Sequence, residues 1–146
     1  CKRYGISKGI ELDPPLFEFF LKDDALGDPM ITEDHIRAFH WAREEEIVQM
    51  RELALKVNAI LYPLFLEAGM LLVDYKLEFG RYQGELLLGD ELSPDGCRIW
   101  DKETGSILDK DLFRHDLGDV IAGYGEVARR LHIPITPVAG EIPKWS

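Results

Sequence analysis

Apolar and charged residues alternate strictly along the segment 73–79. Apolar residues hold the odd positions and charged residues hold the even ones: Val73, Asp74, Tyr75, Lys76, Leu77, Glu78 and Phe79. A period of two predicts a strand with one buried and one open face, which we place over 71–80. The open face carries an acid, a base and an acid in turn. The pattern leaves open whether this is an ordinary solvated sheet face or a set of groups aimed at a ligand.

A β-hairpin is predicted from the residues that follow. Two glycines in the segment 80–84 predict a turn, and the apolar run after it predicts a second strand over 85–90. Pairing across that loop would place Asp74 opposite Asp90, with Cβ atoms roughly 5 Å apart. Two carboxylates at that distance repel each other, so the register predicts that Lys76 or a divalent cation lies between them. A slip of one residue would turn Asp90 to the other face.

Short β segments and helices share the rest of the chain. We expect a strand over 16–21, a loop over 22–29, a helix start at Thr32, a long helix over 43–68, a turn over 93–96, a short strand over 98–101 and a helix over 110–131. These elements predict an α+β fold, an antiparallel sheet with flanking helices. We expect a single domain over 1–146 that ends in an irregular tail over 134–146.

The long helix carries one apolar stripe at spacings of three and four. Its members are Ile47, Met50, Leu53, Val57, Ile60 and Leu64. This spacing indicates packing against the core. Pro63 is expected to kink or interrupt the helix, and Gly69 is expected to end it.

Composition limits the classes of partner. The formal net charge is −10, which argues against nucleic acid because phosphate-backbone binding needs a basic face. No apolar run is long enough to predict a membrane span. Small phosphorylated ligands fit this charge, since a few placed Lys or Arg, or a divalent cation held by carboxylates, can bind them.

Common catalytic motifs are missing from the sequence. It contains no G-x-S-x-G, H-E-x-x-H, P-loop or Rossmann glycine pattern. Cys1 and Cys97 lie far apart without a CxxC partner, so we interpret them as reduced thiols in a cytosolic protein rather than zinc ligands. Surface or packing roles are expected for the four scattered histidines.

The remaining chemistry is a set of carboxylates and cations. Asp74, Lys76, Glu78 and Asp90 belong to the hairpin, Arg98 follows a tight turn, and Lys22 and Asp28 lie in the loop 22–29. Carboxylates in this number suit Mg²⁺, and Lys and Arg suit phosphate or carboxylate groups. The combination is typical of a phosphate-handling site, for example one for ATP. A solvated sheet face and a plain charged loop are the alternatives that the pattern leaves open.

The segment "LVDYKLEFG" resembles a known signature. Together with "PPLFEFFLKDDALGDP", "GDELSPDGCRIWDKETG" and "LDKDLFRHDLGDVIAGYGEVARRL", it is similar to the phosphoribosylaminoimidazole-succinocarboxamide synthases, the SAICAR synthetases of purine biosynthesis. The likeness covers Lys2 to about Leu131. It implies a two-lobed fold related to ATP-grasp enzymes and kinases. It also implies a ligase that joins aspartate to carboxyaminoimidazole ribonucleotide, with ATP and Mg²⁺, giving SAICAR, ADP and phosphate.

The resemblance assigns a role to each candidate residue. Lys22 matches a lysine that contacts ATP, and Asp28 an acid near the metal and the substrate. Asp74 and Lys76 match residues that face the imidazole nucleotide, and Arg98 one that binds its phosphate. Glu78 and Asp90 match carboxylates that serve ATP and its metal ion. Lys76 and Asp28 are the residues we expect to be catalytic.

The resemblance also implies a part that lies outside this sequence. Family members have an N-terminal lobe that covers the ATP, so we expect this chain to be the larger C-terminal lobe. We expect either a fragment or a chain whose missing lobe comes from another chain, inactive alone. The resemblance further implies a cytoplasmic homo-oligomer. The alternative hypothesis is a truncated, non-catalytic relative that binds a nucleotide or a partner chain.

Overall fold

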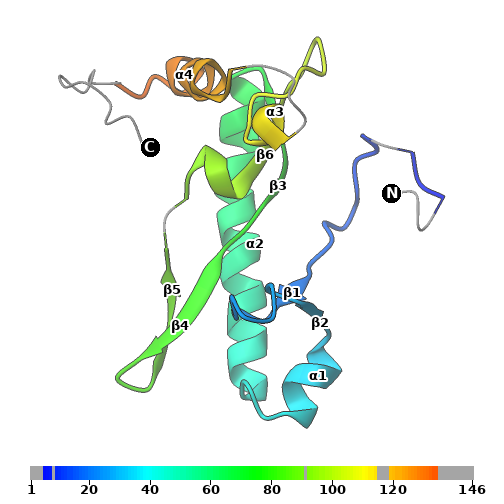
Figure 1. The fold of residues 1–146 in the computed structure, drawn as a ribbon, viewed down its shortest axis with the longest axis vertical. Helices are drawn as coiled ribbons and strands as arrows, with labels where there is room; N and C mark the ends of the chain where they lie inside the picture. Colours follow the sequence, from blue (N-terminus) through cyan, green and yellow to red (C-terminus); the bar gives the residue numbers. More distant parts are fainter. Residues whose placement is uncertain (1–4, 8, 91, 115–118, 135–146) are drawn as a thin grey trace. The chain divides into compact units, whose positions relative to one another are not determined.

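A computed structural model describes residues 5–7, 9–90, 92–114 and 119–134 of the chain (Figure 1). The chain forms two compact units, Cys1–Glu52 and Leu53–Ser146. The boundary falls inside one long helix. The organisation of 1–146 as a single domain stays a prediction, and the expected tail after residue 134 lies outside the described residues.

Antiparallel strand pairs and helices make up both units, as the sequence predicted. The elements are β1 (Phe19–Phe20), β2 (Met30–Ile31), α1 (Glu33–Ala38), α2 (Glu44–Glu67), β3 (Met70–Tyr75), β4 (Glu78–Tyr82), β5 (Glu85–Gly89), a 3₁₀ turn (Pro94–Gly96), β6 (Cys97–Asp101), α3 (Asp111–Arg114) and α4 (Val120–Arg130). Strand β1 pairs with β2, β3 with β6 and β4 with β5, each antiparallel. The α+β class is confirmed.

The first unit begins its helix α1 at Thr32, as predicted. The Thr32 hydroxyl accepts a hydrogen bond from the His35 amide at 3.3 Å, and His35 Nδ1 accepts one from the Thr32 amide at 3.0 Å. This reciprocal capping box satisfies amides that the helix itself leaves without partners. Ile36 of α1 and Ile47 of α2 are buried and form the core of this unit.

The second unit packs its core around one face of β3 and β6. Five buried residues form this core: Phe65 of α2, Met70 of β3, Cys97 and Ile99 of β6, and Val127 of α4. Each large apolar side chain buried here contributes about 1.5–3 kcal/mol. The core therefore holds together the end of α2, the two strands and α4.

The predicted register of the hairpin is wrong. Tyr82 pairs with Glu85, so the turn holds only Gln83 and Gly84, with φ of 52° and 85°. Two successive residues with positive φ are typical of the two-residue turn whose twist matches the strands. Sequence reasoning gave the turn five residues, because it took the glycine at 80 as part of the loop.

The predicted strand 71–80 is two strands that change partner. After Tyr75 the chain leaves β6, the Lys76 amide donates to the Gly96 carbonyl at 2.8 Å, and β4 then pairs with β5. A bulge lies between Leu72 and Asp74. Such an irregularity breaks strict alternation, and Val73, which was predicted to be buried, is 42% exposed.

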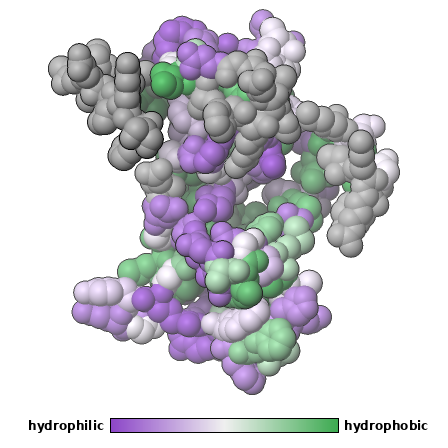
Figure 2. All heavy atoms as spheres, in the orientation of Figure 1, coloured by the Kyte–Doolittle hydropathy of each residue, from purple (hydrophilic) through white to green (hydrophobic). Residues whose placement is uncertain are grey.

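The apolar stripe of α2 is only partly buried. Ile47 is buried, but Ile60 and Leu64 are 68% and 46% exposed. The face turned to the core in the second unit contains Ala54 and Phe65 instead. An α-helix with two apolar faces does not indicate from its own pattern which face meets the core. In Figure 2, hydrophobic residues (green) lie among hydrophilic residues (purple) on the face shown.

Helix α2 otherwise follows the prediction. It runs from Glu44 to Glu67 and continues through Pro63, so the expected interruption there is not found. Gly69, with φ of 72°, ends it as expected. No helix in the described part of the chain is long and apolar enough to cross a membrane.

The single helix predicted over 110–131 is wrong. Helix α3 has four residues, and α4 starts anew at Val120. Asp119 has extended backbone and caps α4, its carboxylate accepting from the Ile121 amide at 2.8 Å. A capping aspartate satisfies helix amides, so it marks a helix start where the apolar pattern alone indicated continuity.

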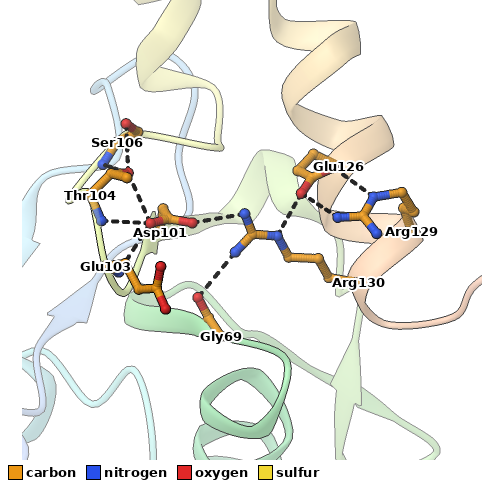
Figure 3. Close-up of polar contacts among 8 residues, drawn as sticks. All are labelled: Gly69, Asp101, Glu103, Thr104, Ser106, Glu126, Arg129 and Arg130. Atoms are coloured by element: carbon orange, nitrogen blue, oxygen red, sulfur yellow. Dashed lines mark hydrogen bonds and ion pairs between the residues drawn. The ribbon is translucent and has the colours of Figure 1, made fainter.

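Arg130 joins α4 to the rest of the second unit (Figure 3). Its Nε donates to Glu126 at 2.6 Å, Nη1 to the Gly69 carbonyl at 3.1 Å, and Nη2 lies 2.7 Å from Asp101. Asp101 also accepts from the Thr104 amide at 2.7 Å. One guanidinium thus connects α4, the end of α2 and the end of β6.

This network predicts a stability that falls in acid. Hydrogen bonds from Thr104 and Arg130 hold the pKa of Asp101 well below its usual range, and Arg129 with Arg130 lowers the pKa of Glu126 to about 2. Carboxyls with depressed pKa in the folded state stabilise above their unfolded pKa, about 4, and lose this effect as they are protonated. We expect the free energy of unfolding to fall between about pH 4 and pH 2.

Urea unfolding of an Arg130→Met variant at several pH values checks this expectation. The variant should be less stable at neutral pH and should lose less stability between pH 4 and pH 2 than the parent. Lys102→Met is the matched control, because it removes the same charge from a neighbouring exposed position. An unchanged pH dependence in Arg130→Met would contradict the assignment.

Candidate functional site

Arg98 and Asp74 are brought together by the pairing of β3 with β6. The two residues are direct cross-strand partners, and Arg98 Nη1 donates to Asp74 Oδ2 at 2.5 Å. Both side chains are about half exposed, at 48% and 52%. The predicted register placed Asp74 opposite Asp90, and this pairing is wrong because β3 pairs with β6 rather than β5.

Asp111 is a second carboxylate on the same guanidinium. Arg98 Nε donates to Asp111 Oδ2 at 3.1 Å, and the Asp111 side chain is only 13% exposed. Asp74 and Asp111 together raise the pKa of Arg98, so the guanidinium keeps its charge at every physiological pH. An exposed, permanently charged guanidinium that is held in place is suited to bind phosphate or carboxylate.

Lys76 and Glu78 form a separate pair. Lys76 Nζ lies 2.5 Å from Glu78 Oε1, with side chains 58% and 26% exposed. Lys76 is thus paired with the acid two residues later. Glu78 opens β4 opposite Gly89 of β5, so Asp90 is the residue after its cross-strand partner. Asp90 is exposed and has a positive φ of 62°.

Lys22 and Asp28 lie in the first unit, in the loop that joins β1 to β2. Lys22 Nζ is 3.9 Å from Asp28 and 3.8 Å from Asp24. Asp28 has φ of 47° and accepts a hydrogen bond from the Asp23 amide at 2.8 Å. A positive φ at a residue other than glycine costs energy and is found often at functional sites. The loop was predicted correctly, and its lysine and acid lie close together.

The carboxylates of the described residues do not gather into a closed metal cage. Within the described residues, no group of three or more His, Cys, Asp or Glu could hold a metal ion. A closed protein cage is therefore not indicated there. Mg²⁺ often binds through one or two carboxylates, several waters and substrate phosphates. Glu78 and Asp90 each supply a carboxylate at one end of the β4–β5 ladder. Asp90 follows the residue that pairs with Glu78, so strand pairing does not place the two side chains on one face.

Sequence reasoning did not single out Asp111, Asp95, Lys110 or Tyr124 as site residues. Asp111 was read only as part of a helix. Asp95, in the turn before β6, accepts from Lys110 Nζ and from the Tyr124 hydroxyl, each at 2.8 Å. The only sequence signal was the run of charges in "DKD" at 109–111. Their partners are 13 to 29 residues away, which local pattern does not reveal.

Cys97 precedes Arg98 but belongs to the core. Its thiol is free and buried, and burial raises the pKa of this thiol to about 11. A thiol in that state is protonated at neutral pH and is a poor nucleophile. The site chemistry near β6 thus comes from charged groups. Cys1 lies outside the described residues.

Comparison with protein families and curated proteins gives a consistent match. The model of the family described as SAICAR synthetase matches residues 1–131. A phosphoribosylaminoimidazole-succinocarboxamide synthase of Nitrosococcus oceani is 63% identical over 131 residues, which are 90% of this chain and 55% of that protein. The synthase of Alcanivorax borkumensis is 60% identical with the same coverage. The chain spans about half the length of the curated relatives it matches.

Solved structures agree with the sequence comparison. The synthase from Ehrlichia chaffeensis superposes with a TM-score of 0.85 at 46% identity, covering 92% of this chain and 59% of that one. A SAICAR synthetase in complex with ADP gives a TM-score of 0.83 at 45% identity, covering 89% of this chain and 56% of that one. The likeness therefore extends through nearly all of this chain in both sequence and fold.

Proposed function

Because this chain belongs to the SAICAR synthetase family, we propose that it forms part of a ligase of purine biosynthesis. The ligase joins the amine of aspartate to the carboxyl group of carboxyaminoimidazole ribonucleotide. ATP is consumed, and SAICAR, ADP and phosphate are formed. The proposal concerns the whole enzyme, since the chain spans about half the length of its curated relatives.

The contact between Arg98 and Asp74 carries the proposal. A phosphorylated substrate needs a placed cation, and Arg98 is exposed yet held by the cross-strand carboxylate. A guanidinium has five N–H groups, and its bonds to two carboxylates leave N–H groups for a ligand. We assign Arg98 to the phosphate of the imidazole nucleotide. Asp74 and Lys76 are assigned to the rest of that substrate.

By the family resemblance, Lys22 of the first unit and Glu78 and Asp90 of the second unit are each assigned to ATP. A Lys ammonium suits the phosphates of ATP. Glu78 and Asp90 are the carboxylates that would bind the Mg²⁺ that accompanies ATP. When bound, the ion neutralises charge that develops on the transferred phosphoryl group. The ADP complex of a related synthetase supports a nucleotide in this fold.

The chemistry that these residues serve has two stages. First, the substrate carboxylate attacks the γ-phosphorus of ATP, and an acyl phosphate and ADP form. The aspartate amine then attacks the acyl carbon, so a C–N bond forms and phosphate leaves. Lys76 is assigned, by the family resemblance, to stabilise negative charge at the reacting carboxyl group. Asp28 is assigned to the reacting groups near the metal, where its carboxylate can accept a proton from the aspartate amine.

We assign the enzyme to the cytoplasm and expect it to be a homo-oligomer. The free thiol of Cys97 is in keeping with a reducing compartment. The oligomeric state rests on the family resemblance and stays a prediction.

A chimeric enzyme tests the proposal. This chain replaces the matching 131 residues of the Nitrosococcus oceani synthase, and ADP release is followed with ATP, Mg²⁺, aspartate and the imidazole nucleotide. We expect aspartate-dependent turnover by the chimera and none by the 146-residue chain alone. A folded chimera that binds nucleotide without turnover would favour a non-catalytic module instead.

A further inference from the structure

Asp111 differs in burial from Asp74, which contacts the same guanidinium. Asp74 is 52% exposed, whereas the Asp111 side chain is 13% exposed. Both contact the same guanidinium, from β3 and from the first residue of α3. The Asp74 contact is therefore open to competition from water. The Asp111 contact is more sheltered from such competition.

Asp111 is anchored to the strand that carries Arg98. The Asp111 amide donates to Asp109 Oδ1 at 2.8 Å, and Asp109 Oδ2 accepts from the Ile99 amide at 2.6 Å. Asp109 is 1% exposed. Its carboxylate therefore links the residue after Arg98 to the start of α3. A second bond, from the Leu108 amide to the Ile99 carbonyl at 2.9 Å, runs beside it.

These bonds form a closed loop through Arg98. Along the backbone, Arg98 leads to Ile99; Ile99 is bonded to Asp109, Asp109 to Asp111, and Asp111 back to the Arg98 side chain. Hydrogen-bonded support of this kind restricts the rotamers of a functional side chain. It fixes Nε of Arg98, and it leaves three of the five guanidinium N–H groups outside the bonds to Asp111 and Asp74.

We infer that Asp111 is a positioning residue that holds Arg98 by its Nε, so that the remaining N–H groups are presented to the phosphate of the substrate. The inference deepens the proposed function and rests on it for the identity of the ligand. Asp111 acts through Arg98 and does not itself contact the substrate. Its removal should therefore weaken substrate binding more than it slows the chemical steps.

The test uses Asp111→Ala in the chimeric synthetase, with Asp34→Ala as the matched control. Asp34 is 95% exposed and pairs only loosely with Arg37, at 3.5 Å in the first unit. We expect the KM for the imidazole nucleotide to rise about tenfold in Asp111→Ala, since small misplacement of a binding group is costly. The kcat and the KM for ATP should change by less than about twofold if the effect is confined to that substrate. Asp111→Asn, which keeps an acceptor oxygen, should restore part of the loss.

A second readout does not depend on turnover. The side-chain Nε–H signal of Arg98 in ¹⁵N NMR, assigned by its loss in Arg98→Lys, should exchange slowly with water in the parent and faster in Asp111→Ala. If Asp111→Ala does not fold, the isosteric Asp111→Asn carries both measurements. Unchanged exchange in a folded variant would contradict the inference that Asp111 holds Arg98 by its Nε. This result would count even if the parent chimera showed no turnover. Faster exchange with an unchanged KM in an active chimera would overturn its role in binding. An inactive parent chimera would count against the proposed function alone.

Discussion

Replacement of Glu78 by glutamine is expected to lower turnover at limiting Mg²⁺-ATP by about 100-fold in the chimeric synthetase. Glutamine keeps the shape of the side chain but removes the charge that we assign to Mg²⁺. Glu78 lies at the start of β4 with its side chain 26% exposed, paired with Lys76. Partly exposed pairs of this kind contribute little to folding, so the free energy of unfolding should change by less than about 1 kcal/mol.

Steady-state kinetics over a range of Mg²⁺-ATP concentrations, together with urea unfolding, would measure both effects. Glu85→Gln is the matched control, because Glu85 lies exposed on the paired strand β5 and has no assigned role. It should leave both quantities near the parent values. A collapse in the melting temperature of Glu78→Gln with unchanged activity per folded molecule would show that Glu78 is structural.

Replacement of Gly123 by alanine is expected to destabilise the second unit by about 1–3 kcal/mol. A Cβ atom at this position would lie 2.9 Å from Leu112 Cδ1 and 3.0 Å from the Leu108 carbonyl oxygen. The leucine end can move, but the backbone oxygen cannot move without disturbing the segment before α3. The overlap should exceed the gain in helix propensity of about 1 kcal/mol that alanine otherwise brings.

The same helix supplies the control for this prediction. A Cβ at Gly125 of α4 would meet nothing within 4 Å. Gly125→Ala should therefore stabilise the chain by about 0.5–1 kcal/mol. Opposite signs in urea unfolding of the two variants would identify close packing at Gly123. Stabilisation by both substitutions would show that α4 can move away from Leu108.

The local signals in the sequence predicted elements well. The cap at Thr32, the charged loop 22–29, the long helix ended by Gly69, and the turn at 93–96 are each written in neighbouring residues, and the structure confirms them. Capping and turn formation depend on side chains and φ values within a few residues. Such features need no knowledge of the rest of the chain.

The wrong predictions concern which segments pair. The alternation at 73–79 was read as one strand of one hairpin, but β3 pairs with β6 and β4 with β5. A bulge and a change of partner leave only weak traces in the sequence, because strand partners are chosen by packing across the whole sheet. The exposed positions of α2, Ile60 and Leu64, were predicted to lie in the core, because the face of a helix that meets the core is also decided by packing.

The candidate residues were identified from their residue types and from the family resemblance. Their contacts were found only in the folded structure. The sequence by itself determined the α+β class, the family and the charged groups that line its signature, because these depend on residue type and short spacing. Only the tertiary structure decided that Asp74 pairs with Arg98 and not with Asp90. It also brought Asp111, 13 residues from Arg98, within hydrogen-bond distance of the same guanidinium. Those contacts depend on the register of distant strands, and register is set by the packing of the whole unit.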